Sequence, residues 1–101
     1  MIVVQNRIRV AEPFRKEFLE RFKNRNSTLM NHDGFISNYI LEPTGDDNEY
    51  VVMTMWESRQ DFEKWANSED FKKSHSEPMQ QGAIIDRPVL KIYNVSSALT
   101  Q

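Results

Sequence analysis

The fold of this chain is decided by the stretch EYVVMTMW, residues 49–56, which is typical of a central β-strand. Successive side chains of a strand point to opposite faces of its sheet. Both faces are apolar here: Tyr50, Val52 and Trp56 lie on one, and Val51, Met53 and Met55 lie on the other. A strand that is covered on one side only alternates more cleanly between apolar and polar residues. We therefore expect helices on one face and a second copy of the chain on the other.

The segments on either side of this strand complete a regular order. Apolar spacing predicts strands at Ile2–Val10, Phe35–Glu42, Glu49–Trp56 and Val89–Val95, a helix from Pro13 to about Arg25–Asn26, and a helical stretch at Ser58–Ser76. A hairpin connection occupies residues 43–48, and Glu77–Arg87 is irregular. The order β-α-β-β-α-β is the ferredoxin-like α+β pattern, with a four-stranded antiparallel sheet. Two such sheets packed face to face would form a dimeric α+β barrel.

Two serines indicate where the second helical stretch begins and where it is interrupted. Ser58 and Asp61 resemble a capping box, in which the first side chain satisfies a free backbone N–H of the first turn. Asn67 and Ser68 interrupt the stretch, and Ser68 can cap a second segment whose first turn is acidic. Trp65 and His75 therefore belong to the same helical region but to different segments of it.

Composition excludes several kinds of protein. A length of 101 residues suits a single domain, and a net charge of −2 with both signs interspersed does not indicate nucleic acid or an anionic membrane as a partner. The absence of cysteine excludes disulfides, thiol nucleophiles and thiolate metal sites. We expect no signal peptide, and no apolar run of the sequence is long enough to span a membrane. We expect a cytoplasmic protein.

Three residues are unusual for their positions and could meet in one pocket. Asn6 interrupts an otherwise apolar row of alternate strand positions, formed by Ile2, Val4, Ile8 and Val10. A buried amide without partners costs about 1–3 kcal/mol, so Asn6 needs a partner in the fold or in a ligand. Trp65 is a large flat aromatic, and His75 follows it ten positions later. Together they offer a polar donor, a flat wall and an imidazole.

Each of these residues also has an ordinary structural explanation. Asn6 could bond to neighbouring backbone, Trp65 could be a core residue, and His75 could be a surface histidine near a helix end. His32 is interpreted as a turn residue beside Asp33 and Gly34. The two histidines do not have the spacing of a zinc site. The three glycines are scattered, so a phosphate-binding loop is excluded.

The sequence resembles the IsdG-type haem-degrading monooxygenases, which belong to the antibiotic biosynthesis monooxygenase superfamily. The matching pieces are Asn6-Arg7, Glu20-Arg21-Phe22, Gly34-Phe35, Met55–Trp65 and Ser68–His75. The pattern W-x-S-x-x-x-F-x-x-W, followed by F-K-x-x-H, is the most specific of them. The resemblance implies that residues 1–101 form a single domain of this type and that the protein is a homodimer.

The resemblance also implies a role for each candidate site residue. His75 would be the proximal axial ligand of haem iron, which sets the electronic properties of the iron. Trp65 would favour a distorted porphyrin, and Asn6 would donate a hydrogen bond on the distal side. Phe22 would help to bind the haem, and Ile84 and Ile85 would line or cover the pocket.

Haem would then be both cofactor and substrate of the implied reaction. The reaction would use O2 and an external electron donor, with a reductase as an expected partner. It would release iron and an open-chain tetrapyrrole. The resemblance leaves open which tetrapyrrole forms, which donor supplies the electrons, and whether the purpose is iron acquisition or haem detoxification.

Three other functions are compatible with the same fold. The first is a cofactor-independent monooxygenase that acts on a phenol or quinol, which would have no need of His75 as an axial ligand. The second is a haem-binding module without turnover, and the third is a dimeric structural domain without a ligand. The response of the purified protein to haemin separates the haem-binding module from the other two.

Overall fold

The computed structural model of the chain describes residues 1–75 and 79–101. The helices and strands are β1 Ile2–Arg9, α1 Arg15–Arg25, β2 Phe35–Leu41, β3 Glu49–Trp56, α2 Arg59–Ala66, α3 Glu69–Ser74 and β4 Val89–Asn94. Short 3-10 turns, η1 Glu12–Phe14 and η2 Asn26–Asn31, precede and follow α1. The predicted order is confirmed, and the second helical stretch consists of two helices. Ser76 and Glu77, which end one predicted segment and begin the next, lie outside the described residues.

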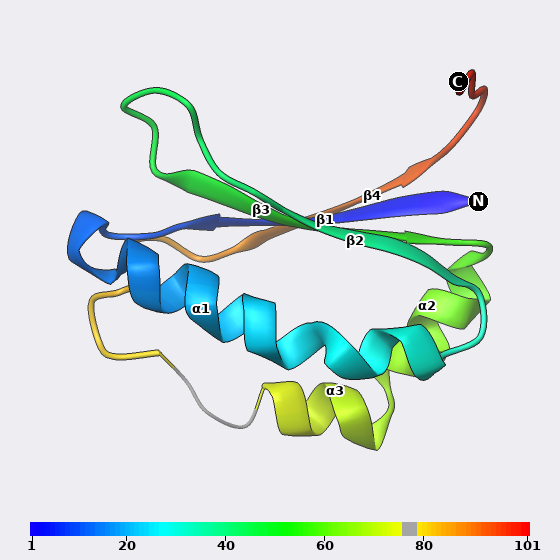
Figure 1. Ribbon diagram of the computed structural model, residues 1–101, viewed down its shortest axis with the longest axis horizontal. Helices are drawn as coiled ribbons and strands as arrows, with labels where there is room; N and C mark the ends of the chain where they lie inside the picture. The colour runs from blue at the N-terminus through cyan, green and yellow to red at the C-terminus, as the bar shows by residue number, and fades with distance from the viewer. Residues whose placement is uncertain (76–78) are drawn as a thin grey trace.

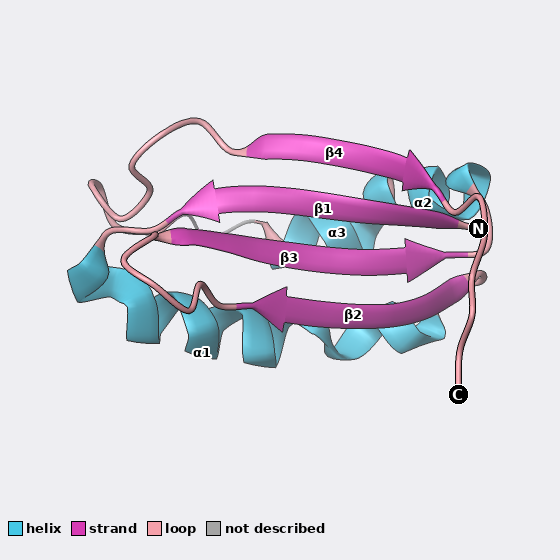
Figure 2. Cartoon of the chain, turned by 90° about the horizontal axis from the view of Figure 1, so that it is seen from above, coloured by secondary structure: helices cyan, strands magenta, loops and turns pink. Residues whose placement is uncertain are grey.

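The four strands form one antiparallel sheet in the order β2-β3-β1-β4. The two central strands pair from Ile2 opposite Trp56 to Arg9 opposite Glu49. All three α-helices lie on one face of the sheet (Figure 1). Seen from the opposite side, the other face is left uncovered by them (Figure 2). The ferredoxin-like α+β fold is therefore confirmed, with an open sheet in the single chain.

The core lies between the sheet and the helices and is divided into two clusters. The first contains Ile2, Val4, Leu29 and Trp56, and the second contains Ile8, Val10, Phe18 and Tyr50. Burying an apolar side chain of this size contributes about 1.5–3 kcal/mol, so both clusters stabilise the sheet–helix interface. Asn6 lies on β1 between the residues that β1 gives to the two clusters.

A serine caps the N-terminus of α2, and another serine caps the N-terminus of α3. The Ser58 hydroxyl accepts a hydrogen bond from the Asp61 backbone N–H at 3.1 Å and donates to the Asp61 carboxylate at 2.8 Å. The Ser68 hydroxyl likewise accepts from the Phe71 backbone N–H at 3.2 Å. Both predicted caps are confirmed, and they set where each helix begins.

Gly34 brings the start of β2 close to the start of α2. Its φ is +79°, in the left-handed region that favours glycine, and a Cβ at this position would collide with the Asp61 side chain. The Glu57 backbone N–H donates to the Gly34 carbonyl at 2.8 Å. A glycine is therefore required for this close approach.

A β-bulge near the start of β2 sets which of its side chains face the helices. The register with β3 shifts between Phe35 and Ser37, so that Phe35 lies opposite Trp56 while Asn38 lies opposite Thr54. Phe35 and Asn38 consequently share the helix-covered side of the sheet. Simple alternation from Phe35 would have placed Asn38 on the other side.

The open face of the sheet is largely apolar, as expected from the composition of β3. Large exposed side chains on it are Tyr39, Leu41, Val89 and Tyr93, beside the partly buried Val51, Met53 and Met55. Arg7 crosses this face and donates to the Gln5 side chain at 3.1 Å.

Among the described residues, no helix has the length and apolarity needed to cross a membrane.

Candidate functional site

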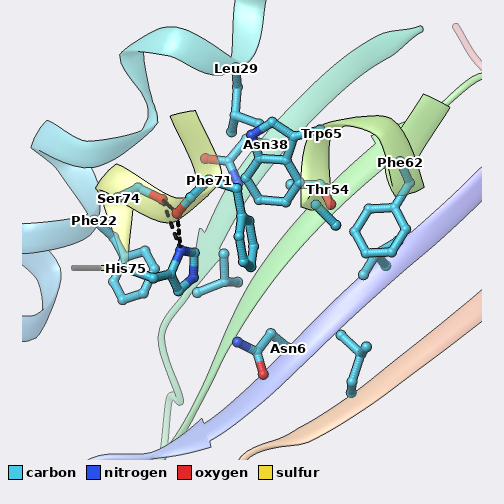
Figure 3. Close-up of a pocket in the computed structure, with 14 residues that line it drawn as sticks. Asn6, Phe22, Leu29, Asn38, Thr54, Phe62, Trp65, Phe71, Ser74 and His75 are labelled. Carbon is cyan, nitrogen blue, oxygen red and sulfur yellow. Dashed lines mark hydrogen bonds between the residues drawn. The ribbon is translucent and has the colours of Figure 1, made fainter. Parts of the chain in front are cut away.

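A cavity of about 470 Å³ lies between the sheet and the helices. Its volume is in the range of small-molecule and cofactor sites. The lining is mostly apolar and aromatic, with contributions from all three helices and all four strands (Figure 3). The polar residues in the lining are Asn6, Asn38, Thr54, Ser74 and His75. Such a pocket suits a large apolar ligand with a few specific polar contacts.

The structure brings Asn6, Phe22, Trp65 and His75 to this one cavity. Asn6 rises from β1 on the sheet side, whereas His75 lies at the end of α3 on the helix side (Figure 3). Phe22 comes from α1 and Trp65 from α2. The cavity therefore lies between an amide and an imidazole, with aromatic rings at its walls.

The Asn6 amide is not used by the fold. It is partly buried, and within the described part of the chain no hydrogen bond involves its side chain. Among the described residues, the Asn6 side chain therefore makes no hydrogen bond to neighbouring backbone, which was the structural alternative for this residue. The amide faces the cavity, where a ligand could supply its partner (Figure 3).

Hydrogen bonds set the protonation of the two nitrogens of His75. Nδ1 lies 2.8 Å from the Phe71 carbonyl oxygen and 2.9 Å from Ser74 Oγ, and the Ser74 hydroxyl donates to the same carbonyl at 2.8 Å. Because a carbonyl oxygen only accepts, Nδ1 carries the proton and donates. The lone pair of the neutral ring is then on Nε2, as in a histidine that is ready to bind a metal.

His75 would be a single protein ligand rather than a member of a cluster. In residues 1–75 and 79–101, no group of three or more His, Cys, Asp or Glu side chains is placed to hold a metal ion. Metal sites built by the protein alone use several such ligands. A metal that brings its own equatorial ligands, as iron does in haem, needs only one axial histidine.

A row of aromatic rings connects His75 to the core. The His75 ring stacks on Phe71 at 4.0 Å and 25°, and Phe71 meets Trp65 edge-on at 4.8 Å and 90°. Trp65 in turn packs on the fully buried Trp56 at 5.6 Å. Trp65 therefore both packs against the core and lines the cavity.

Some residues of the site were not identified from the sequence. Phe71 and Ser74 hold the imidazole, and Asn38 and Thr54 add polar groups to the lining. The Asn38 amide donates to the Met53 carbonyl of the neighbouring strand at 3.1 Å. The signal that identified Asn6, an amide between apolar residues at alternate strand positions, is also present for Asn38, between Ile36 and Ile40.

Two expectations about the surroundings of the site are corrected. Ile84 and Ile85 were expected to line or cover the cavity, but neither belongs to its lining. Ile84 packs against the second core cluster, and Ile85 is 45% exposed. A β-bridge between Val10 and Ile84 holds this segment at the edge of the sheet. The interpretation of His32 as only a turn residue was incomplete. Its ring nitrogen Nε2 lies 2.9 Å from an Asp70 carboxylate oxygen on α3.

The fold and the cavity define a class of small α+β domains that have an apolar pocket between an antiparallel sheet and its helices. Within that class, residues 1–77 match the sequence model of the family described as Antibiotic biosynthesis monooxygenase. The match covers most of the 101 residues. The chain belongs to this family.

Relatives of known activity are similar over nearly the whole chain. The chain is 29% identical over 90 residues to Heme oxygenase (staphylobilin-producing) 1 of Staphylococcus aureus (strain Newman). The aligned region covers 87% of this chain and 83% of that protein. It superposes on the haem degrader MhuD of Mycobacterium tuberculosis, solved with two haems in its active site, with a TM-score of 0.81, 26% identity, and coverage of 99% of this chain and 100% of MhuD. A variant of MhuD with two manganese protoporphyrin IX molecules per active site gives a TM-score of 0.85 at 25% identity, with both chains fully covered.

Proposed function

We propose that this protein is a haem-degrading monooxygenase. It binds haem in the cavity between sheet and helices and opens the porphyrin with O2 and electrons from an external donor. The products are iron and an open-chain tetrapyrrole. The observation that carries this proposal is the geometry of His75, whose Nδ1 is bonded to the Phe71 carbonyl while Nε2 remains available to iron.

The cavity fits the substrate chemically. Its walls are apolar and aromatic, as a porphyrin face requires, and its volume of about 470 Å³ suits a ligand of this size. Haem supplies the iron at which O2 is activated. The chain supplies the axial ligand, the orientation and a mostly apolar lining.

Asn6 and Trp65 have roles that follow from their positions. The Asn6 amide lies on the sheet side of the cavity, away from α3, so it is suited to donate a hydrogen bond on the face of the haem opposite His75. A ligand in the cavity would give this partly buried amide the partner that the described residues do not supply. Trp65 is held by Trp56 behind it and presents a rigid wall that favours a distorted porphyrin. Phe22 adds a further aromatic wall on the α1 side.

An absorbance series on the purified protein tests this function. Stoichiometric haemin should shift the Soret band, and ascorbate or a reductase in air, with catalase present, should then remove the band and produce bilin-like absorbance. A shifted band that survives reduction would contradict degradation and favour a haem-binding module. Absence of any shift would turn attention to a phenol or quinol substrate or to a domain without a ligand.

We further propose that the protein is a homodimer whose open sheet faces pack together into an α+β barrel. The apolar side chains of that face support this arrangement, with Tyr39 and Tyr93 still 53% and 46% exposed in the single chain. Contiguous apolar surface of this kind usually marks an interaction site. Sedimentation analysis should give about twice the 12.0 kDa chain mass, and Tyr39→Glu should give the chain mass. A cytoplasmic location and a reductase partner stay predictions.

A further inference from the structure

A side-chain contact joins two segments that are distant in the sequence. His32, at the junction of η2 and β2, has its Nε2 2.9 Å from Oδ2 of Asp70 in the first turn of α3. The His32 side chain is 19% exposed and the Asp70 side chain 38%. Since a carboxylate oxygen only accepts, Nε2 donates this bond whether His32 is neutral or protonated.

The helix that carries His75 needs such a contact. α3 has six residues, and none of its described residues is fully buried. A helix of this length is not stable in isolation, so its position depends on tertiary contacts. Phe71 packs on Trp65 near the cavity, and Asp70 anchors the first turn to a different part of the molecule.

The other end of the contact is firmly held. The His32 backbone N–H donates to the Leu29 carbonyl at 3.1 Å, and the Phe35 N–H donates to the His32 carbonyl at 3.3 Å. Leu29 is a buried member of the first core cluster, and Phe35 packs against that cluster. His32 is therefore attached to the core on both sides, whereas Asp70 is attached to the short helix.

We propose that His32 and Asp70 are positioning residues that hold α3 in register with the core, so that His75 is kept at the cavity. The anchoring of α3 does not depend on the proposed function; only the expected effect on haem affinity rests on it. Displacement of α3 by a fraction of a turn would carry Phe71 and His75 together away from the cavity, because both residues belong to this helical turn. Loss of the contact should therefore make α3 more mobile and, as a consequence, weaken the binding of haem iron by His75.

A second ion pair on the same helix provides a matched control. Lys72 and Glu69 lie 3.7 Å apart, with side chains that are 67% and 81% exposed. This pair connects α3 only to itself, and exposed pairs contribute about 0–1 kcal/mol. Glu69→Gln also removes a negative charge from the first turn, as Asp70→Ala does, so it isolates the effect of the contact with His32.

The first measurement uses the haem-free protein. Hydrogen exchange should be compared in the wild type, His32→Ala, Asp70→Ala, His32→Gln and Glu69→Gln. We expect peptides of residues 69–75 to exchange about threefold to tenfold faster in the two alanine variants, with the central strands unchanged, because local opening free energy falls when a tertiary contact is lost. His32→Gln keeps an N–H donor near the same place and should recover most of the protection.

The second measurement is haemin affinity by absorbance titration. The alanine variants should bind about tenfold more weakly, while Glu69→Gln should bind as the wild type does. Unchanged exchange in residues 69–75, or equal effects of Asp70→Ala and Glu69→Gln, would overturn the proposal. If the wild type binds no haemin, the proposed function fails, and the exchange measurement still decides whether this contact anchors α3.

Discussion

Phe71 and His75 lie one helical turn apart with their rings stacked at 4.0 Å, and the carbonyl oxygen of Phe71 is 2.8 Å from Nδ1 of His75. The stack limits the tilt of the imidazole, and the hydrogen bond limits its rotation. One residue therefore sets both the direction and the tautomer of the candidate ligand. A ring that is oriented before binding loses less conformational entropy when it binds iron.

His75→Ala should weaken haemin binding at least about tenfold and abolish turnover, because it removes the axial ligand. His75 is exposed and ends α3, so the fold should be retained. Absorbance titration measures the binding, with circular dichroism to check the fold. Free imidazole added to the variant should restore a histidine-like Soret spectrum. Wild-type turnover in His75→Ala would remove this residue from the mechanism.

Asn6→Ala should leave haemin affinity nearly unchanged and slow degradation by about tenfold or more, as expected for loss of one positioned donor. The protein should not lose stability, because the amide has no bond to the described part of the chain. Asn38→Ala is the matched control in the same cavity. Its amide donates to the Met53 carbonyl, so the variant should lose about 1 kcal/mol of stability. Thermal unfolding and single-turnover absorbance separate the two effects.

Trp65→Phe should reduce porphyrin distortion and the rate of degradation while haem still binds. The smaller ring presents less wall to the cavity and less surface to Trp56. Resonance Raman out-of-plane modes report the distortion directly. Trp56→Phe is the control, since Trp56 is fully buried and its indole N–H donates to Thr54 at 3.0 Å. That control should lower stability, and a fully active Trp65→Phe protein would contradict the role given to Trp65.

Gly34→Ala should destabilise the fold by at least about 1–2 kcal/mol, since the left-handed backbone conformation alone costs a residue with a Cβ this much. The added methyl group would also collide with Asp61. Gly82→Ala tests the conformational cost alone, because its φ is +89° and a Cβ there meets open space. Gly45→Ala, in open space without a positive φ, should be neutral. Chemical denaturation of the three variants checks the order of the effects.

The sequence by itself determined the element order and much of the local structure. The alternation in Ile2–Arg9, the apolar run in Glu49–Trp56 and the caps at Ser58 and Ser68 depend on neighbours within a few residues. The sequence pattern alone therefore identifies these elements. The resemblance to haem-degrading monooxygenases rested most strongly on Met55–Trp65 and Ser68–His75, two stretches that contain these serines. Asn6 in particular was conspicuous because a polar residue in an apolar row has few local explanations.

Only the tertiary structure decided how the site is assembled. The bulge between Phe35 and Ser37 turns Asn38 toward the cavity, and it arises from pairing with β3 rather than from the composition of β2. His32 meets Asp70, 38 positions later, because the fold places the turn after η2 beside the first turn of α3. Periodicity describes one element at a time, whereas contacts between elements depend on the packing of all of them. For that reason the pattern suggested that Asn6, Trp65 and His75 could meet in one pocket, but not that Asn38 and Thr54 line the same cavity.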